Sequence, residues 1–389
     1  MATILLAIVL GALVYSVLSI LAAIRYLRVP LPTANSTEAV SILKPLSGLD
    51  DNLESNLRTF FEQNYPAFEI LFAVRHANDP AVAVVEKLQL EYPQVPTRLL
   101  VTGEPPCPNA KVFSLSHMLK IAANDLVVMS DSDIRAPSNL LRNVAAEFQD
   151  VNLGVATCPY RAVPADSFWS RLEATGLNTD FLSGILVARM LEGMKFAVGA
   201  TIAARRRALE GIGGFERLKD YLAEDFVMGK LVAAAGYRVI LSSQVVEHCP
   251  GSSGLRQIAA HRLRWVRSTR RSRPAGYVGQ LFTMPLPVAV VLCLADPAWW
   301  PVLPLTLLVR GAAAYVVSAR VLRTRINWLL LPIEDLVGFG FWLAGFFGHT
   351  IVWREQRYRL NRDGRCEVLG EKRAHVQGID SSYFPHIEK

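Results

Sequence analysis

The sequence has few of the features that mark disulfide-linked, zinc-binding or nucleic-acid-binding proteins. Its five cysteines are scattered over 389 residues, and no two of them form a Cys-x-x-Cys pair. This spacing indicates neither a disulfide framework nor a zinc site, and it suits a reducing cytosolic environment. No zinc-finger or RNA-binding motif is present, and the basic residues lie beside apolar stretches. We therefore expect no nucleic-acid partner.

Charged residues are also scarce, at 19% of the chain, whereas hydrophobic residues make up 51% and the mean hydropathy is +0.26. This composition is too apolar for an ordinary soluble enzyme. The formal net charge of +7 is concentrated in the second half, which indicates local contact with anionic lipid or phosphate. The chain is long enough for one large globular domain combined with membrane segments.

The first apolar run covers residues 2–24 and contains no charged residue, so it is long enough to cross a bilayer. Arg25 and Arg28 follow it directly. Because basic residues mark the cytosolic side, we predict an N-terminal transmembrane anchor over residues 1–28 with the amino terminus outside. A cleaved signal peptide is the alternative, but its charges would precede the apolar run, and no Ala-x-Ala site is evident.

A basic stretch precedes the second apolar region. Residues 255–271 combine an apolar side with many arginines, which predicts an amphipathic helix lying in the membrane interface, within the segment 251–276. We expect membrane segments over residues 277–353 and a basic cytosolic tail over residues 354–389.

Three apolar runs lie in this C-terminal region, at residues 281–294, 299–321 and 336–352. Three crossings would place the basic tail outside, against the charge rule. Either one segment is re-entrant or the short first one lies in the interface, so the sequence leaves the number of crossings open.

Residues 38–250 alternate short apolar runs with stretches of helical pattern. The expected strands cover residues 40–43, 70–74, 98–101, 126–129, 154–158, 197–203 and 238–241, and the expected helices cover residues 52–63, 81–92, 112–123, 167–190 and 226–235. This alternation predicts an α/β domain with a mostly parallel, doubly wound sheet. Such sheets bind ligands at the carboxyl ends of their strands.

Asp131 and Asp133 come directly after the buried strand at residues 126–129. Their oxygens could hold Mg²⁺ or Mn²⁺ against a diphosphate, although short acidic triplets also occur in solvated turns. Asp79 follows the strand at residues 70–74, and we expect it at the same edge, one strand away from Asp131. It could bind a base or ribose hydroxyl, or it could simply cap the helix that begins near Pro80.

Glu224 and Asp225 open the helix that ends near Gly236. A carboxylate here could act as a general base toward an attacking hydroxyl, although acidic residues are favoured at any helix start. Lys111 could reach a nucleotide phosphate, or it could be merely solvated. Gly199 lies in a turn that could let the backbone approach a ligand closely, although a packing glycine explains it equally well.

His261, Arg264 and Trp265 lie on the expected basic helix. An arginine facing a departing diphosphate would stabilise the charge that develops on it, and a tryptophan offers a flat wall to a sugar or a lipid chain. The alternative is a helix that binds lipid headgroups, in which all arginines are interchangeable.

The order of these residues resembles that in membrane glycosyltransferases with a GT-A fold, and most closely that in ceramide glucosyltransferases. The resemblance rests on several short motifs between residues 40 and 360: Leu43-Lys44-Pro45-Leu46 with Gly48, Asn56-Leu57, Phe60-Phe61, Tyr65-Pro66, Asn78-Asp79-Pro80-Ala81, Asp131-Ser132, Ala223-Glu224-Asp225, Arg264-Trp265, Trp353-Arg354 and Arg357-Tyr358-Arg359-Leu360.

This resemblance implies a role for each acidic position. Asp79 would contact the uridine of a UDP-sugar, Asp131 and Asp133 would bind the diphosphate through a divalent cation, and Asp225 would be the catalytic base. Arg264 with Trp265 matches the terminal motif of the family. Two positions depart from the pattern: residue 261 is histidine where the wider family usually has glutamine or arginine, and Asp133 completes an Asp-x-Asp that the animal ceramide enzymes lack.

The expected function is that of an inverting glycosyltransferase that moves a sugar from a UDP-sugar to a hydroxyl of a membrane lipid, with UDP-glucose and ceramide as the model pair. The sequence also resembles bacterial hopanoid-associated transferases, which implies N-acetylglucosamine and a hydroxylated triterpenoid as the alternative pair. A non-catalytic nucleotide-sugar-binding scaffold and a polysaccharide synthase are further hypotheses. We expect the protein in a bacterial inner membrane, with its catalytic domain facing the cytoplasm.

Overall fold

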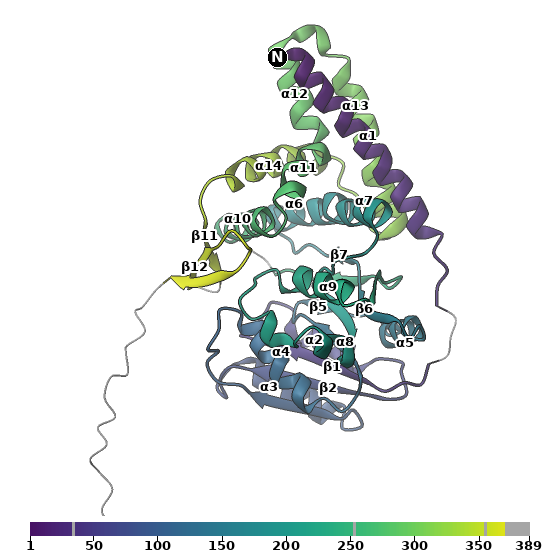
Figure 1. Cartoon of the computed structure of the whole chain (residues 1–389), viewed down its shortest axis with the longest axis vertical. Helices are drawn as coiled ribbons and strands as arrows, with labels where there is room; N and C mark the ends of the chain where they lie inside the picture. The colour runs from purple at the N-terminus through teal and green to yellow at the C-terminus, as the bar shows by residue number, and fades with distance from the viewer. Residues whose placement is uncertain (33–35, 252–253, 354–355, 370–389) are drawn as a thin grey trace, which may run out of the picture.

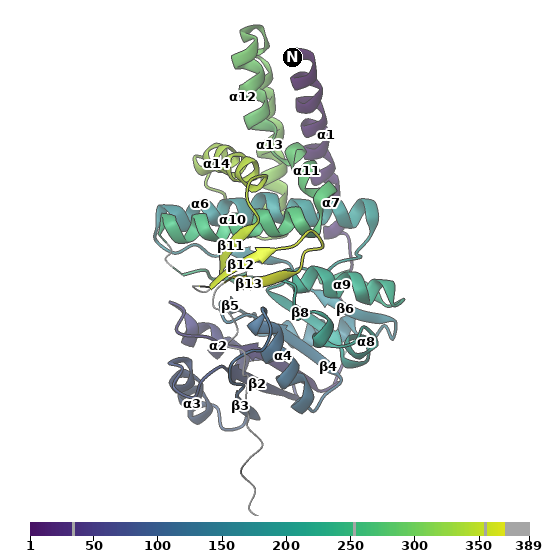
Figure 2. The same cartoon turned by 60° about the vertical axis from the view of Figure 1, so that its left-hand side comes forward.

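The computed structural model describes residues 1–32, 36–251, 254–353 and 356–369. The described chain forms three tiers along its longest axis (Figures 1 and 2). A bundle of α1, α12 and α13 projects at one end, an α/β domain lies at the other, and a layer containing α6, α7 and α10 separates them. The site described below lies where the α/β domain meets this middle layer.

The α/β domain is built on a seven-stranded sheet with the order β3-β2-β1-β4-β8-β6-β9. Strands β1 to β4 are mutually parallel where they pair, whereas β8 is antiparallel to both β4 and β6, and β9 is parallel to β6. The prediction of a mostly parallel sheet is therefore confirmed. The strands are β1 (Val40–Pro45), β2 (Phe68–Val74), β3 (Thr97–Val101), β4 (Leu126–Ser130), β6 (Leu153–Thr157), β8 (Thr201–Arg205) and β9 (Arg238–Leu241).

Both faces of the sheet are covered by helices, which explains why its strands are continuously apolar. Alternate residues such as Ile42 and Val128 face one core, whereas Leu43 and Val127 face the other. The first core also contains side chains of α2 (Leu53–Phe61), α3 (Ala81–Glu91) and α5 (Leu140–Glu147), and the second contains those of α4 (Ala110–Ile121), α8 (Arg206–Gly211) and α9 (Glu224–Ala234).

Two details of the sheet differ from expectation. The strand predicted at residues 197–203 begins only at Thr201, because residues 197–200 form the loop that contains Gly199. Strand β1 lies between β2 and β4, so Asp79 is two strands from Asp131 rather than one. The strand order reverses between β1 and β4, and ligands of open α/β sheets bind at such a reversal.

A small second sheet lies beside this edge. It joins β5 (Ile134–Arg135), β10 (Val246–His248) and β7 (Tyr160–Ala162), with His248 opposite Ile134. This pairing brings residues that are more than 100 positions apart in the sequence next to the end of β4.

Two described helices are long and apolar enough to cross a membrane: α1 (Ala2–Leu27) and the continuous stretch Val302–Val321, which comprises α13 (Val302–Tyr315) and the π-helix η5 (Val316–Val321). A bent pair, Pro274–Thr283 with α12 (Pro285–Ala295), is a third candidate with a 67° bend. Val288 and Leu292 of α12 pack against Val9 of α1. This arrangement allows two or three crossings, with α12 and α13 forming a hairpin beside α1 (Figure 1).

The apolar run at residues 336–352 does not form a single helix in the described structure. Helix α14 (Leu330–Gly345) has 16 residues and is not among the candidate spans, and β11 (Thr350–Trp353) follows it after a turn at Gly348, where φ is +79°. Figures 1 and 2 show α14 between the projecting bundle and the layer of α6 and α10. The C-terminal sheet lies beside the α/β domain, where Arg365 pairs with Tyr221.

The tail predicted at residues 354–389 is partly structured. Strands β12 (Gln356–Leu360) and β13 (Cys366–Leu369) pair antiparallel and join β11 in a three-stranded sheet. Residues 354–355 and 370–389 of the predicted tail lie outside the described residues.

Buried ion pairs connect α14 to its neighbours. Arg262 of α10 (Leu255–Ser272) lies 2.8 Å from Glu334 of α14, and Arg310 of α13 lies 2.8 Å from Asp335 and 2.6 Å from Asp180. Asp180 belongs to the π-helix η1 (Leu177–Phe181), which joins α6 (Phe168–Gly176) to α7 (Leu182–Glu192). Charged groups next to a bilayer are costly unless they are paired, and here each charge has an opposite partner.

Candidate active site

An acidic cluster lies at the carboxyl edge of the sheet, where three elements meet. Asp131 follows β4, and its Oδ1 lies 2.7 Å from Nζ of Lys111 near the start of α4. The same Nζ lies 3.1 Å from Oε1 of Glu224, the first residue of α9. The structure therefore brings three of the sequence-predicted site residues into one chain of ion pairs.

Asp225 lies next to this chain and is held by backbone donors. Its Oδ2 accepts a hydrogen bond from the N–H of Gly199, and its Oδ1 accepts one from the N–H of Phe226 at 2.7 Å. A Cβ at position 199 would lie 3.2 Å from Oδ2, so glycine lets the backbone approach the carboxylate. Burial, reinforced by the negative charge of Glu224, raises the pKa of Asp225 to about 6. A carboxylate tuned toward neutral pH is suited to accept a proton.

This shifted pKa predicts an acid limb in the pH profile of a reaction that uses Asp225 as a base. The raised pKa means that Asp225 is ionised above pH about 6 and becomes protonated as the pH falls through that value. We expect kcat/KM to drop tenfold per pH unit below this limb. Nucleotide affinity measured over the same range serves as the control, and a rate that stays constant down to pH 5 would contradict the assignment.

Asp133 forms a second pair at the same edge. Its Oδ2 lies 3.1 Å from Nε2 of His248, a residue of β10. Burial opposes ionisation of both groups, but their mutual attraction prevails, so the pKa of Asp133 is lowered and that of His248 is raised. The second oxygen of Asp133, Oδ1, is buried and has no hydrogen-bond partner among the described residues.

The residues at this edge fit a divalent cation. Within the described parts of the chain, no group of three or more histidine, cysteine or acidic side chains is already arranged as a metal site. However, Asp131 and Asp133 are two residues apart, one buried oxygen lacks a partner, and carboxylates are the ligands that Mg²⁺ and Mn²⁺ prefer.

Asp79 lies at the same edge of the sheet but in another group. Its carboxylate accepts hydrogen bonds from the N–H of Gly48, at 3.0 and 3.1 Å, and from the N–H of Ala81, at 2.9 Å. It thus joins the loop after β1 to the start of α3. In this structure Asp79 therefore makes the contacts expected of a residue that caps the start of α3.

The residues predicted on the basic helix belong to a third group. His261 Nδ1 lies 2.7 Å from Oε1 of Glu173 on α6, and the ring of His261 lies 4.9 Å from that of Trp265. The Arg264 guanidinium lies over the ring of Trp353, 5.5 Å from its centre.

A column of aromatic rings connects this third group to the edge that carries Asp133 and His248. The Trp265 ring lies 5.7 Å from that of Phe181, which lies 5.2 Å from that of Tyr160. The Tyr160 ring in turn lies 5.4 Å from that of His248. The column places an apolar wall between the middle helical layer and the acidic cluster.

Sequence reasoning missed several residues of this site, notably Lys44, Tyr160, Glu173 and His248. Lys44 is buried at the end of β1, where its Nζ donates to the carbonyl of Asp131 at 2.5 Å and lies 3.8 Å from the centre of the Phe60 ring. Burial lowers the pKa of Lys44 to about 7. The position of Lys44 within an apolar strand could have identified it as a site residue. By contrast, no sequence pattern near His248 indicates that it contacts Asp133.

Comparisons with known proteins agree with this architecture. The mannosyltransferase PcManGT from Pyrobaculum calidifontis, solved with GDP-Man and Mn²⁺, superposes with a TM-score of 0.53 at 20% identity, covering 89% of this chain and 97% of its own. The α/β domain therefore has the GT-A fold of glycosyltransferases.

Curated relatives include ceramide glucosyltransferase 1 of Caenorhabditis elegans, 31% identical over 206 residues, which are 52% of this chain and 44% of the relative. Ceramide glucosyltransferase 3 of the same species is 28% identical over 60% of this chain and 51% of its own length. The ceramide glucosyltransferase of Komagataella phaffii is 34% identical over 34% of this chain and 27% of its own length. The chain thus spans about half or less of the relatives it matches.

The family model for glycosyl transferase family 21 matches residues 4–366, which is nearly the whole chain. This match includes the candidate membrane helices, the acidic cluster and the basic helix α10. The protein is a member of glycosyl transferase family 21.

Proposed function

We propose that this protein is an inverting transferase that moves a sugar from a UDP-sugar to a hydroxyl group of a membrane lipid, as a ceramide glucosyltransferase does. The observation that carries the proposal is the convergence of Asp131, Lys111, Glu224 and Asp225 at one edge of the sheet.

The donor would bind at the carboxyl edge. Asp131 and Asp133 would hold the divalent cation, which would supply positive charge against the diphosphate when bound. Lys111 would offer its ammonium group to the same phosphates, since it already lies between two carboxylates and remains charged. Asp79 would orient the loop that carries Gly48 beside the nucleotide.

The acceptor hydroxyl would approach along the aromatic column. Trp265 and Phe181 offer an apolar wall that leads from the middle helical layer to the acidic edge. Asp225 would remove the hydroxyl proton, the oxygen would attack the anomeric carbon, and the bond to UDP would break on the opposite side. Because this path needs no covalent enzyme intermediate, it inverts the configuration of the anomeric carbon.

The donor and the acceptor can be tested together. Membranes that contain the protein are incubated with radiolabelled UDP-glucose plus ceramide, or with UDP-N-acetylglucosamine plus a hydroxylated hopanoid, and the lipids are separated by chromatography. We expect a labelled glycolipid whose anomeric configuration is opposite to that of the donor. Product from UDP-glucose and ceramide would support the ceramide assignment. Product from the second pair alone would assign the protein to the hopanoid branch, and no product from any UDP-sugar with a lipid extract would favour a binding scaffold.

A further inference from the structure

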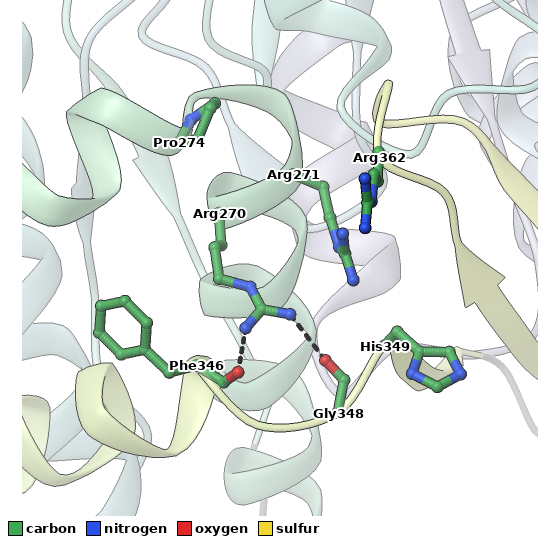
Figure 3. A pocket seen from close by; sticks show the side chains of 7 residues that line it. All are labelled: Arg270, Arg271, Pro274, Phe346, Gly348, His349 and Arg362. Carbon is green, nitrogen blue, oxygen red and sulfur yellow. Dashed lines mark hydrogen bonds between the residues drawn. The ribbon is translucent and has the colours of Figure 1, made fainter.

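A cavity lies away from the acidic cluster, at the C-terminal end of α10. Its volume is about 580 Å³, and Figure 3 shows the side chains around it. The wall is formed by the end of α10, the start of α11 (Pro274–Gly279), the turn after α14 and the turn between β12 and β13: Arg270, Arg271, Pro274, Phe346, His349 and Arg362.

Three guanidinium groups line this cavity, and they come from two separate elements. Among the described residues, no carboxylate lies within 4.0 Å of Arg270, Arg271 or Arg362, and the nearby Asp363 pairs with Arg365 at 3.5 Å. Helix dipoles favour arginines in the last turn of α10, but they do not explain Arg362, which comes from the C-terminal sheet. Like charges that converge on a cavity are stabilised by an anion.

The arginines are partly fixed in place. Arg270 donates to the carbonyl of Phe346 and, at 2.8 Å, to that of Gly348, so its guanidinium is held at the turn after α14. Nε of Arg271 is buried and has no partner in the described structure. Burial and the positive charges of Arg270 and Arg362 lower the pKa of Arg271. Three positive charges, one of them partly buried, therefore face the same cavity.

The surroundings of the cavity point to a lipid as the source of the anion. Phe346 lines the cavity, and the adjacent Phe347 is 73% exposed at the end of the apolar helix α14. Helix α14 also exposes Ile333, Leu336 and Leu343, and it lies between the projecting bundle and the layer of α6 and α10 (Figures 1 and 2). The arginines thus border the apolar surface of α14. In a bilayer, lipid phosphates border the acyl chains in the same way.

The cavity is also separate from the proposed donor site. A small cavity of about 20 Å³ is lined by Lys111, Gly199, Glu224 and Asp225, and it shares no lining residue with the arginine-lined one. Guanidinium groups bind phosphate oxygens through paired hydrogen bonds, which suits a phosphodiester. We propose that the arginine-lined cavity binds the phosphate group of an anionic phospholipid from the leaflet that faces the α/β domain.

Bound lipid would affect the helix that carries the family's terminal motif. Arg270 and Arg271 lie one to two turns beyond Trp265 on α10. A lipid phosphate held between Arg271 and Arg362 would therefore join this helix to the C-terminal sheet at the membrane surface. The inference does not depend on the proposed function, because binding can be measured without a sugar donor.

The test uses the full chain in detergent micelles and calorimetric titration with dihexanoyl-phosphatidylglycerol. Parallel titrations with dihexanoyl-phosphatidylcholine, inorganic phosphate and UDP distinguish the sources of phosphate. We expect saturable binding of phosphatidylglycerol, weaker binding of phosphatidylcholine, and little competition from phosphate or UDP. Equal affinity for both lipids, or displacement by inorganic phosphate at comparable concentration, would overturn the proposal.

Two variants locate the site. The double substitution Arg271→Gln with Arg362→Gln should weaken phosphatidylglycerol binding about tenfold or more. Arg256→Gln, which changes an exposed arginine at the other end of α10, is the matched control and should bind as the wild type does. Arg362→Gln alone changes an exposed side chain, so it still tests the site if the double variant does not fold. Wild-type affinity in Arg362→Gln and in a folded double variant would refute the proposal.

Discussion

The substitution Asp225→Asn should reduce sugar transfer by about 10²- to 10⁴-fold, because an amide cannot take the proton of an attacking hydroxyl. Asp225 is positioned for this role by the N–H groups of Gly199 and Phe226, which fix both of its oxygens. Nucleotide binding should change little, since Asp131, Lys111 and Glu224 retain their mutual contacts. Transfer is measured with a radiolabelled donor, and nucleotide affinity by calorimetric titration.

Asp166→Asn provides the matched control for this change. The side chain of Asp166 is fully exposed, and its ion pair with Arg171 is the kind of surface contact that contributes little to stability. This variant should transfer sugar at the wild-type rate. If Asp225→Asn instead lost its affinity for UDP and kept its rate at saturating donor, Asp225 would be a donor-binding residue and the base would lie elsewhere.

Removal of divalent cations should abolish transfer, and Asp133→Asn should weaken the cation-dependent part of UDP binding about 10- to 100-fold. The physical reason is the buried Oδ1 of Asp133, which has no partner among the described residues and which a bound cation would satisfy. Loss of the Asp133 charge also leaves His248 without its anionic partner.

The measurement is a titration of UDP in the presence of EDTA and then with added Mn²⁺ or Mg²⁺. Wild-type protein should bind UDP more tightly when the cation is present, whereas Asp133→Asn should show little difference between the two conditions. Asp166→Asn again serves as the control. Full turnover in EDTA would contradict the assignment, and it would leave Lys111 as the principal positive charge at the diphosphate.

Much of the fold could be predicted because its determinants are local. The apolar run at residues 126–129 is followed at once by carboxylates, and this pattern alone identifies a buried parallel strand that ends at a polar edge. Parallel strands carry their carboxyl ends to one side, so Asp79 and Asp131 could be assigned to the same edge before the strand order was known.

The missed features depend on contacts between distant segments. His248 meets Asp133 only because β10 pairs with β5, and no local pattern encodes that pairing. Helix α14 resembled a membrane span because it is apolar, although Glu334 and Asp335 within it are buried against arginines of other helices. Hydropathy averages over such residues and therefore does not reveal these ion pairs.

The ion pairs of Arg310 bear on how the polypeptide enters the bilayer during synthesis. Asp180 leaves the ribosome well before Arg310, and Asp335 follows only 25 residues after it. An unpaired arginine in a membrane helix costs several kilocalories, so an acidic partner that is already folded lowers the barrier to insertion at the moment when the helix emerges. We therefore expect that stable insertion of the hairpin depends on the two acidic partners of Arg310.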